Sequence, residues 1–168
     1  MKSHKAIRDM IVFAMFGALL FAGKIVFEAL PNIHPVAMLI MVITVTYRVK
    51  ALIPIYLFVI ILGLYYGFPQ WWIPYTYIWT VLWGMTMLIP RNIPKEIAVV
   101  VYPIVCGLFG LMFGALYAPV QALLYGYDFA FTIKWIIAGL SYDVAHAIGN
   151  FGMGFNVYPL TNVIKKLK

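Results

Sequence analysis

Long apolar runs separated by short polar breaks make up almost the whole chain. The runs extend over about residues 7–30, 31–47, 51–66, 74–89, 96–117 and 131–163. A helix needs about 20 residues to cross a bilayer, with a range of roughly 17–25, so the second to fourth runs are at or below the short end. We predict an all-α integral membrane protein in which one domain, residues 1–168, forms six transmembrane helices, with four or five spans as the alternative.

Basic residues occupy the breaks on one side of this six-span arrangement. They are Lys2, Lys5, Arg8, Arg48, Lys50, Arg91, Lys95, Lys165, Lys166 and Lys168. Of the twelve Lys and Arg residues, only Lys24 and Lys134 lie elsewhere. Because basic residues concentrate on the cytoplasmic side of membrane proteins, this pattern predicts that both termini are cytoplasmic.

The amino-acid composition supports a membrane protein rather than a soluble domain. It is 65% hydrophobic and only 10% charged, whereas a soluble domain carries roughly 25% charged residues. The net charge of +7 does not indicate a nucleic-acid partner, because the basic residues sit between apolar runs. Cys106 is the only cysteine, which excludes an intrachain disulfide. The first run is too long for a cleaved signal peptide, so we expect a retained first span.

The first apolar run carries a stripe of small residues. Ala14, Ala18 and Ala22 repeat every four residues and so share one helix face. Small side chains allow another helix to approach closely, which is a main source of helix association inside membranes. The stripe therefore predicts a docking face for a partner helix.

The last run contains its own polar cluster. Asp143, His146 and Asn150 are spaced by three and four residues, so they share a helix face, and Tyr142 is adjacent. Ionisable groups at membrane depth are costly and usually face a cavity or a partner. This favours a ligand site or a proton relay; the alternative is that Asp143 and His146 satisfy each other or lie near the interface.

Two further stretches on the outer side carry polar and aromatic residues. The first span ends in Glu28, Asn32 and His34, which either contact a ligand or form an ordinary solvated helix end. Lys24 either snorkels to the interface or pairs with Glu28, four residues on. The loop 68–77 is rich in rigid aromatic rings, which suit either stacking on a flat ligand or an interfacial belt. The candidate ligand-binding residues are Glu28, Asn32, His34, Gln70, Trp71, Trp72, Tyr75, Tyr77, Tyr125, Asp128, Tyr142, Asp143, His146 and Asn150.

Enzymatic and metal-dependent functions lack a recognisable pattern. The sequence has no GxxxxGK[ST], HExxH or GxSxG motif. His34, His146, Asp143 and Glu28 have no spacing specific for a metal. We therefore predict a protein that is not an enzyme, has no catalytic residues, metal or cofactor, and draws energy for uphill transport from another chain or from an ion gradient.

Three features together resemble the S-components of energy-coupling factor transporters, which are the substrate-binding subunits of vitamin importers. They are the small six-span chain with both termini inside, the Ala14–Ala18–Ala22 stripe matching the AxxxA docking motif of that family, and the polar and aromatic outer loops followed by a polar last helix. The resemblance implies a multi-pass protein of the bacterial cell membrane. It also implies an outward-open vitamin site, docking on a transmembrane coupling subunit, and two ATPase subunits that use ATP.

The substrate expected from this resemblance is a vitamin, with cobalamin as the first expectation. A flat corrin would suit the loop around Trp71 and Trp72, and His34 or His146 could approach its cobalt. A queuosine precursor or another flat heterocycle would suit the same surface. Two other classes are weighed against the importer: a small proton- or ion-coupled secondary transporter that uses Asp143 and His146, and an intramembrane enzyme. The lack of an inverted repeat weakens the secondary transporter.

Overall fold

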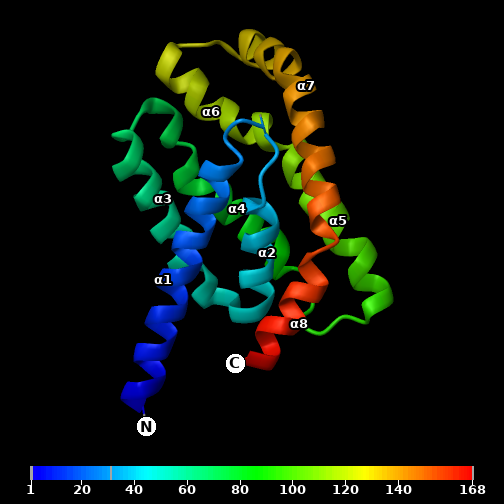
Figure 1. Cartoon of the computed structure of the whole chain (residues 1–168). Helices are drawn as coiled ribbons and strands as arrows, with labels where there is room; N and C mark the ends of the chain where they lie inside the picture. Colours follow the sequence, from blue (N-terminus) through cyan, green and yellow to red (C-terminus); the bar gives the residue numbers. More distant parts are fainter. Residues whose placement is uncertain (1, 31, 168) are drawn as a thin grey trace.

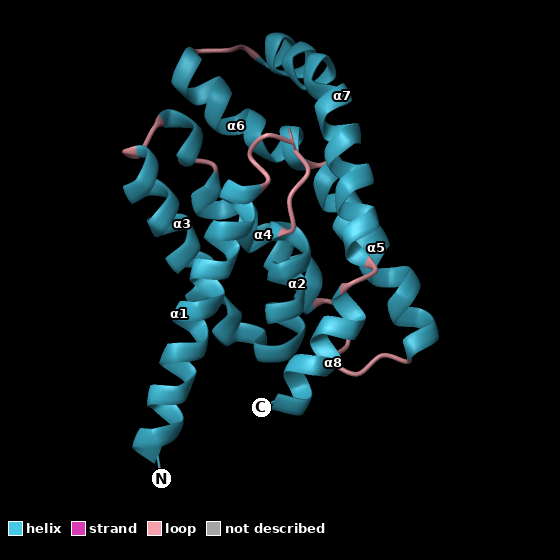
Figure 2. Cartoon of the chain, in the orientation of Figure 1, coloured by secondary structure: helices cyan, strands magenta, loops and turns pink. Residues whose placement is uncertain are grey.

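The computed structural model describes residues 2–30 and 32–167, and every regular element within them is helical (Figures 1 and 2). The elements are α1 (Lys2–Val26), α2 (Val36–Tyr47), η1 (Arg48–Ala51), α3 (Leu52–Tyr66), η2 (Gln70–Trp72), α4 (Tyr75–Met87), α5 (Lys95–Leu111), α6 (Phe113–Tyr125), α7 (Phe129–Gly154) and α8 (Val157–Leu167), where η marks a 3-10 helix. The prediction of an all-α fold is confirmed.

Helices of membrane-spanning length are present in the described part of the chain. Ala6–Val26, Val36–Tyr66 and Lys95–Tyr125 are long and apolar enough to cross a membrane. The second of these includes α2, η1 and α3, and the chain reverses direction between α2 and α3 (Figure 1). Arg48 marks the reversal with a φ of 55°, a left-handed conformation that is uncommon outside glycine.

The two chain ends lie at the same end of the bundle, together with η1 (Figure 1). The loop between α1 and α2 lies at the opposite end, where α6 runs across the bundle before α7 returns. We call the end with the two termini and η1 the basic end, and the end with the α1–α2 loop and α6 the outer end. This layout follows from short connections between antiparallel helices, which bring alternate breaks to the same side.

Helix α2 forms the centre of the packing. Residues 36–46 are all buried, and α1, α4 and α8 pack around them. A helix that is apolar on all faces needs apolar surroundings, and α2, which has no charged residue, finds them among the other helices. The core continues through Phe58, Trp79 and Phe109, whose rings contact one another in sequence.

Glycines bring α5 and α7 into close contact. A Cβ added to Gly110 would lie 2.8 Å from backbone atoms of His146 and Ala147, and one added to Gly107 would lie 3.2 Å from the Phe151 side chain. Small residues three apart thus let two backbones approach as they do in membrane helix pairs. The result is the most extensive helix contact in the described chain, and it sets the position of α7 along the axis of α5.

Three predicted boundaries are wrong. The second run becomes helical only at Val36, because the chain turns through residues 27–35. The fifth run does not end near residue 117: α6 continues to Tyr125 and ends at Gly126, whose φ of 68° suits a helix C-terminus. The last run is two helices, because the chain turns after Gly154 and α8 then packs against α2.

Basic side chains join the elements of the basic end. The Arg48 guanidinium donates to the carbonyls of Met87 and Ile89, at 2.7 and 3.2 Å. Arg91 donates to the Thr46 carbonyl at 3.1 Å, and Lys165 donates to the Arg91 carbonyl at 3.2 Å. These bonds connect α2, α4 and α8 across the region where their helices end. Charged donors also satisfy carbonyls that a helix C-terminus leaves without an intrahelical partner.

Candidate functional site

An open pocket of about 350 Å³ lies at the outer end. We call it the aromatic pocket. Its lining residues come from α1, the α1–α2 loop, α3, η2, α4 and α6 and are Lys24, Glu28, Tyr66, Trp71, Tyr75 and Tyr117. Four aromatic rings and one residue of each charge offer both flat apolar contacts and opposite charges, which suits a small ligand with a polar or dipolar edge.

Hydrogen bonds hold the walls of the aromatic pocket in place. The Tyr66 hydroxyl donates to Glu28 Oε1 at 2.8 Å, and the Tyr117 hydroxyl donates to the Trp71 carbonyl at 2.6 Å. Trp71 also contacts Tyr66 and Tyr75 edge-on, with ring centroids 5.2 and 5.5 Å apart. The pocket is therefore largely formed before any ligand arrives.

A second, smaller pocket of about 200 Å³ lies on the other side of Tyr117. Asn32, Tyr142 and Asp143 line it, together with Trp135 and other residues of α6 and α7. The Asn32 side chain donates to the Tyr142 carbonyl at 3.3 Å and so ties the α1–α2 loop to α7. Tyr117 belongs to both pockets.

Asp143 is committed to a structural bond. Its carboxylate accepts from the Gly114 N–H at 2.9 Å, in the first turn of α6, and the residue is only 6% exposed. A Cβ on Gly114 would overlap the carboxylate. The carboxylate thus caps α6 from another helix and is favoured there by the positive end of the helix dipole. The bond does not involve His146.

Two histidines lie next to each other at the centre of the outer half. His34 is 4% exposed and His146 is 1% exposed, and their ring centroids are 5.4 Å apart. The ring centroid of Trp79 is 6.5 Å from that of His34. Asn150 is buried on the same face of α7 as His146. We call these four residues the histidine core.

Polar atoms of the histidine core have no hydrogen-bond partner among the described residues. They are His34 Nδ1, Trp79 Nε1, both ring nitrogens of His146 and Asn150 Nδ2. Most buried polar groups in proteins are hydrogen-bonded, so each exception calls for an explanation such as a functional role or a bound molecule. Burial lowers the pKa of His34, in the loop outside the candidate spans, to about 3. Its ring is therefore neutral at physiological pH, with one donor and one acceptor nitrogen.

Aromatic contacts connect the histidine core to the aromatic pocket. Tyr75 lines the pocket and contacts Trp79 with ring centroids 5.4 Å apart. Phe113 lines the smaller pocket and contacts His146 at 4.9 Å and Trp79 at 6.0 Å. Only one ring layer therefore separates the pockets from the unpartnered nitrogens.

Nine of the fourteen candidate residues fall into three groups. Glu28, Trp71 and Tyr75 line the aromatic pocket, and Asn32, Tyr142 and Asp143 line the smaller one. His34, His146 and Asn150 lie in the histidine core beneath them. The structure thus brings nine of these residues to one end of the bundle. Their predicted role in ligand binding stays a prediction.

The remaining candidates lie outside these pockets and make internal hydrogen bonds. Tyr125 donates to Gln70 at 2.8 Å, Tyr77 donates to the Leu116 carbonyl, and Trp72 donates to the Val59 carbonyl at 2.7 Å. Asp128 is the N-cap of α7 and accepts from the Phe131 N–H at 2.7 Å. These bonds give each of them a structural role.

Sequence reasoning missed Lys24, Tyr66, Trp79, Phe113 and Tyr117 as parts of the site. Lys24 was interpreted as snorkelling to the interface or as pairing with Glu28, four residues on, and Tyr66 was not singled out. The aromatic residues had no signal, because each lies in an apolar stretch where a ring facing lipid and a ring facing a pocket give the same pattern.

The alanine stripe stays exposed. Ala14, Ala18 and Ala22 are all exposed, whereas Phe13 and Leu20 of α1 are buried. Gly17 packs against Leu57 of α3. The small-residue contact that the bundle uses internally is therefore the one between α5 and α7, and the α1 stripe is left for another chain or for lipid.

The described residues contain no group of three or more His, Cys, Asp or Glu side chains that could hold a metal ion. No protein-family model, curated protein or solved structure matches the chain.

Proposed function

We propose that this chain is a membrane-embedded substrate-binding subunit of the S-component type, with six spans, both termini in the cytoplasm and a pocket open to the outside of a bacterial cell membrane. One observation carries the proposal. A pre-formed aromatic pocket with Lys24 and Glu28 at its rim lies above buried nitrogens that have no partner among the described residues, and it opens at the end opposite the basic residues.

The orientation of the chain follows from its two ends. Arg48, Arg91 and Lys165 gather at the end that also holds the termini. The positive-inside rule assigns that end to the cytoplasm, so the aromatic pocket faces outward. A pocket on that side suits capture of a nutrient from the medium.

The partners follow from the same proposal. The exposed face of Ala14, Ala18 and Ala22 is available to a transmembrane coupling subunit, and two ATPase subunits supply the energy. Close approach of a second helix to such a stripe requires small side chains. A bulky residue at Ala18 stops uptake and leaves ligand binding unchanged, which a paired uptake and binding assay measures.

The size of the aromatic pocket bears on the substrate. Its volume of about 350 Å³ is near the lower limit of the roughly 300–1,000 Å³ typical of small-molecule sites. A cobalamin, with its corrin and nucleotide, is much larger than this space. The volume therefore favours the second expected substrate class, a small flat heterocycle such as a queuosine precursor, over cobalamin.

Ligand recovery tests the proposal directly. The protein is purified from its host in mild detergent, its absorption spectrum is recorded, and small molecules released on denaturation are identified by mass spectrometry. Lys24→Gln removes one charge from the pocket and lowers ligand recovery about tenfold, because a charge-assisted contact contributes about 1.5–3 kcal/mol. Lys134→Gln, which removes an exposed charge elsewhere, is the matched control.

The outcomes separate the competing functions. A flat heterocycle that depends on Lys24 supports the proposal, whereas a released corrin restores cobalamin as the substrate. Absence of any ligand and of co-purifying ATPase subunits contradicts the importer and favours an ion-coupled secondary transporter. That transporter would need Asp143 as a proton carrier, and the Asp143 carboxylate is already bonded to the α6 N-terminus.

A further inference from the structure

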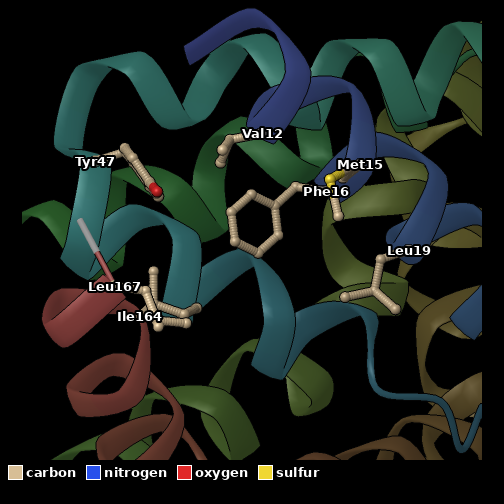
Figure 3. Close-up of a pocket in the computed structure, with 7 residues that line it drawn as sticks. All are labelled: Val12, Met15, Phe16, Leu19, Tyr47, Ile164 and Leu167. Atoms are coloured by element: carbon tan, nitrogen blue, oxygen red, sulfur yellow. The ribbon is translucent and has the colours of Figure 1, made fainter. Parts of the chain in front are cut away.

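A groove of about 380 Å³ runs along α1 in the half of the bundle nearer the basic end (Figure 3). Val12, Met15, Phe16 and Leu19 form its α1 wall. Their spacing of three and four residues places them on one helix face, distinct from the alanine stripe. All of these side chains are apolar, and Met15 and Leu19 are exposed.

The opposite wall comes from α8 and the end of α2. Ile164 and Leu167 face α1 across the groove, and Tyr47 lies at one end of it (Figure 3). The Tyr47 ring contacts Phe16 with a centroid distance of 5.9 Å, so the two rings form one side of this end of the groove. The groove is thus a slot bounded by helices on both sides.

Basic residues stand beyond the Tyr47 end of the groove. Arg8 is one turn before Val12 on the same face of α1, about 6 Å further along the helix axis at 1.5 Å per residue. Arg8 is exposed. Lys166 is exposed at the adjacent end of α8, beside the groove residues Ile164 and Leu167. The apolar slot therefore leads to a positively charged mouth.

We propose that this groove binds one acyl chain of an anionic phospholipid, with Arg8 and Lys166 holding its phosphate. Acyl chains run along the membrane normal, as α1 does in the proposed arrangement, and their headgroups lie at the interface where the basic residues collect. Cytoplasmic leaflets are rich in anionic lipid, which attracts juxtamembrane Lys and Arg. The proposal rests on the membrane orientation of the chain and is independent of what the outer pocket binds.

Native mass spectrometry of the detergent-purified chain tests this site. The protein is titrated with phosphatidylglycerol or phosphatidylcholine of identical acyl chains, and retained lipid is counted. The wild type retains phosphatidylglycerol with a preference of about thirtyfold, as expected for two cationic groups at one phosphate. Arg8→Gln combined with Lys166→Gln abolishes the preference, whereas the matched single charge removal Lys134→Gln at the outer end keeps it.

A second variant separates the groove from the charged mouth. Val12→Trp fills the slot and lowers retention of both lipids, whereas Ile137→Trp, on the exposed face of α7, does not. Elution of each variant as a monodisperse peak shows that it is folded. An unchanged lipid preference in the double charge variant overturns the proposal, as does cross-linking of residue 16 to a co-purified protein subunit in place of lipid.

Discussion

Two polar clusters of this bundle, one at the basic end and one in the outer half, differ in whether their polar groups have hydrogen-bond partners. At the basic end, Arg48, Arg91 and Lys165 each donate to backbone carbonyls of neighbouring elements. In the outer half, His34 and His146 lie buried beside each other with ring nitrogens that have no partner in the described part of the chain. Both arrangements bring distant segments together, but only the first does so with satisfied hydrogen bonds.

The basic cluster therefore stabilises the fold, whereas the histidine core lowers its stability. A hydrogen bond to a charged group contributes about 1.5–3 kcal/mol, whereas a buried polar group without a partner costs about 1–3 kcal/mol. The α5–α7 glycine contact and the Asp143 cap hold α7 in place around the histidine core. The basic end and these contacts therefore offset the cost of the histidine core. Five variants or conditions test this division.

The largest effect is expected at the glycine contact that supports the histidine core. Gly110→Val places a side chain against the backbone of His146 and Ala147 and forces α7 away from α5. Overpacking of this kind costs about 3 kcal/mol. Unfolding in sodium dodecyl sulfate titrations measures it, with Gly139→Val as the control, since a Cβ there meets nothing within 4 Å. Equal stability of the two variants would contradict the proposed role of the contact.

Removing the central cation of the basic end has the next largest effect. Arg48→Met leaves the Met87 and Ile89 carbonyls without their charged donor. We expect a loss of about 2 kcal/mol in the free energy of unfolding, measured by the same titration. Ligand recovery from the folded fraction stays unchanged, because the outer pocket is at the other end. A variant as stable as the wild type would show that these bonds are not what secures the basic end.

Acid distinguishes the two ends because only the outer one holds buried histidines. The pKa of His34 is lowered by burial to about 3, against about 6.5 in the unfolded chain. Its contribution to stability is therefore full above pH 6.5 and is lost as the pH falls toward 3, by up to about 1.4 kcal/mol per pH unit. We expect His34→Leu to reduce the loss of stability between pH 6.5 and 5. The same slope in both proteins would count against a neutral, buried His34.

Replacing an unpartnered histidine should have the opposite sign to the Arg48 change. His146→Leu removes two nitrogens that have no partner among residues 2–30 and 32–167. We expect the free energy of unfolding to rise by about 1 kcal/mol while ligand recovery falls, because a buried polar group is replaced by an apolar one of similar size. A less stable variant would indicate that these nitrogens are bonded to water or to another group.

The exposed ion pair at the basic end should matter least. Lys50 Nζ lies 2.8 Å from Asp9 Oδ2, and the lysine side chain is 59% exposed. An exposed pair contributes about 0.5 kcal/mol, and salt screens it. Lys50→Met therefore changes stability by no more than this, and the change disappears at high ionic strength. A loss as large as that of Arg48→Met would show that charge, rather than burial, decides which contacts matter here.

The sequence was informative where one physical requirement dominates. Uniformly apolar runs predicted helices, and the all-α fold is confirmed. The spacing of Asp143, His146 and Asn150 correctly predicted a shared face, and all three are buried. These patterns depend only on helix periodicity and on the cost of polar groups in apolar surroundings.

The rest depended on contacts between distant segments. The position of Trp71 beside Tyr117 follows from how η2 meets α6, and neither residue differs in pattern from an interfacial aromatic. Asp143 was read as a partner of His146 or of a ligand, but it bonds to Gly114, 29 positions earlier in the chain. Helix ends were also misplaced. Hydropathy ended the fifth run before the true end of α6 at Gly126, and it continued the last run through the turn that separates α7 from α8 after Gly154.

Tyr117 forms a wall of both outer pockets, and this has a thermodynamic consequence. A molecule that displaces the Tyr117 ring on entering one pocket also reshapes the other, so occupancy of the two is linked. By reciprocity, the factor by which the first molecule changes the affinity for the second equals the factor by which the second changes the affinity for the first. If both pockets bind molecules, the Tyr117 ring and its hydrogen bond to the Trp71 carbonyl are the elements through which their occupancies would be coupled.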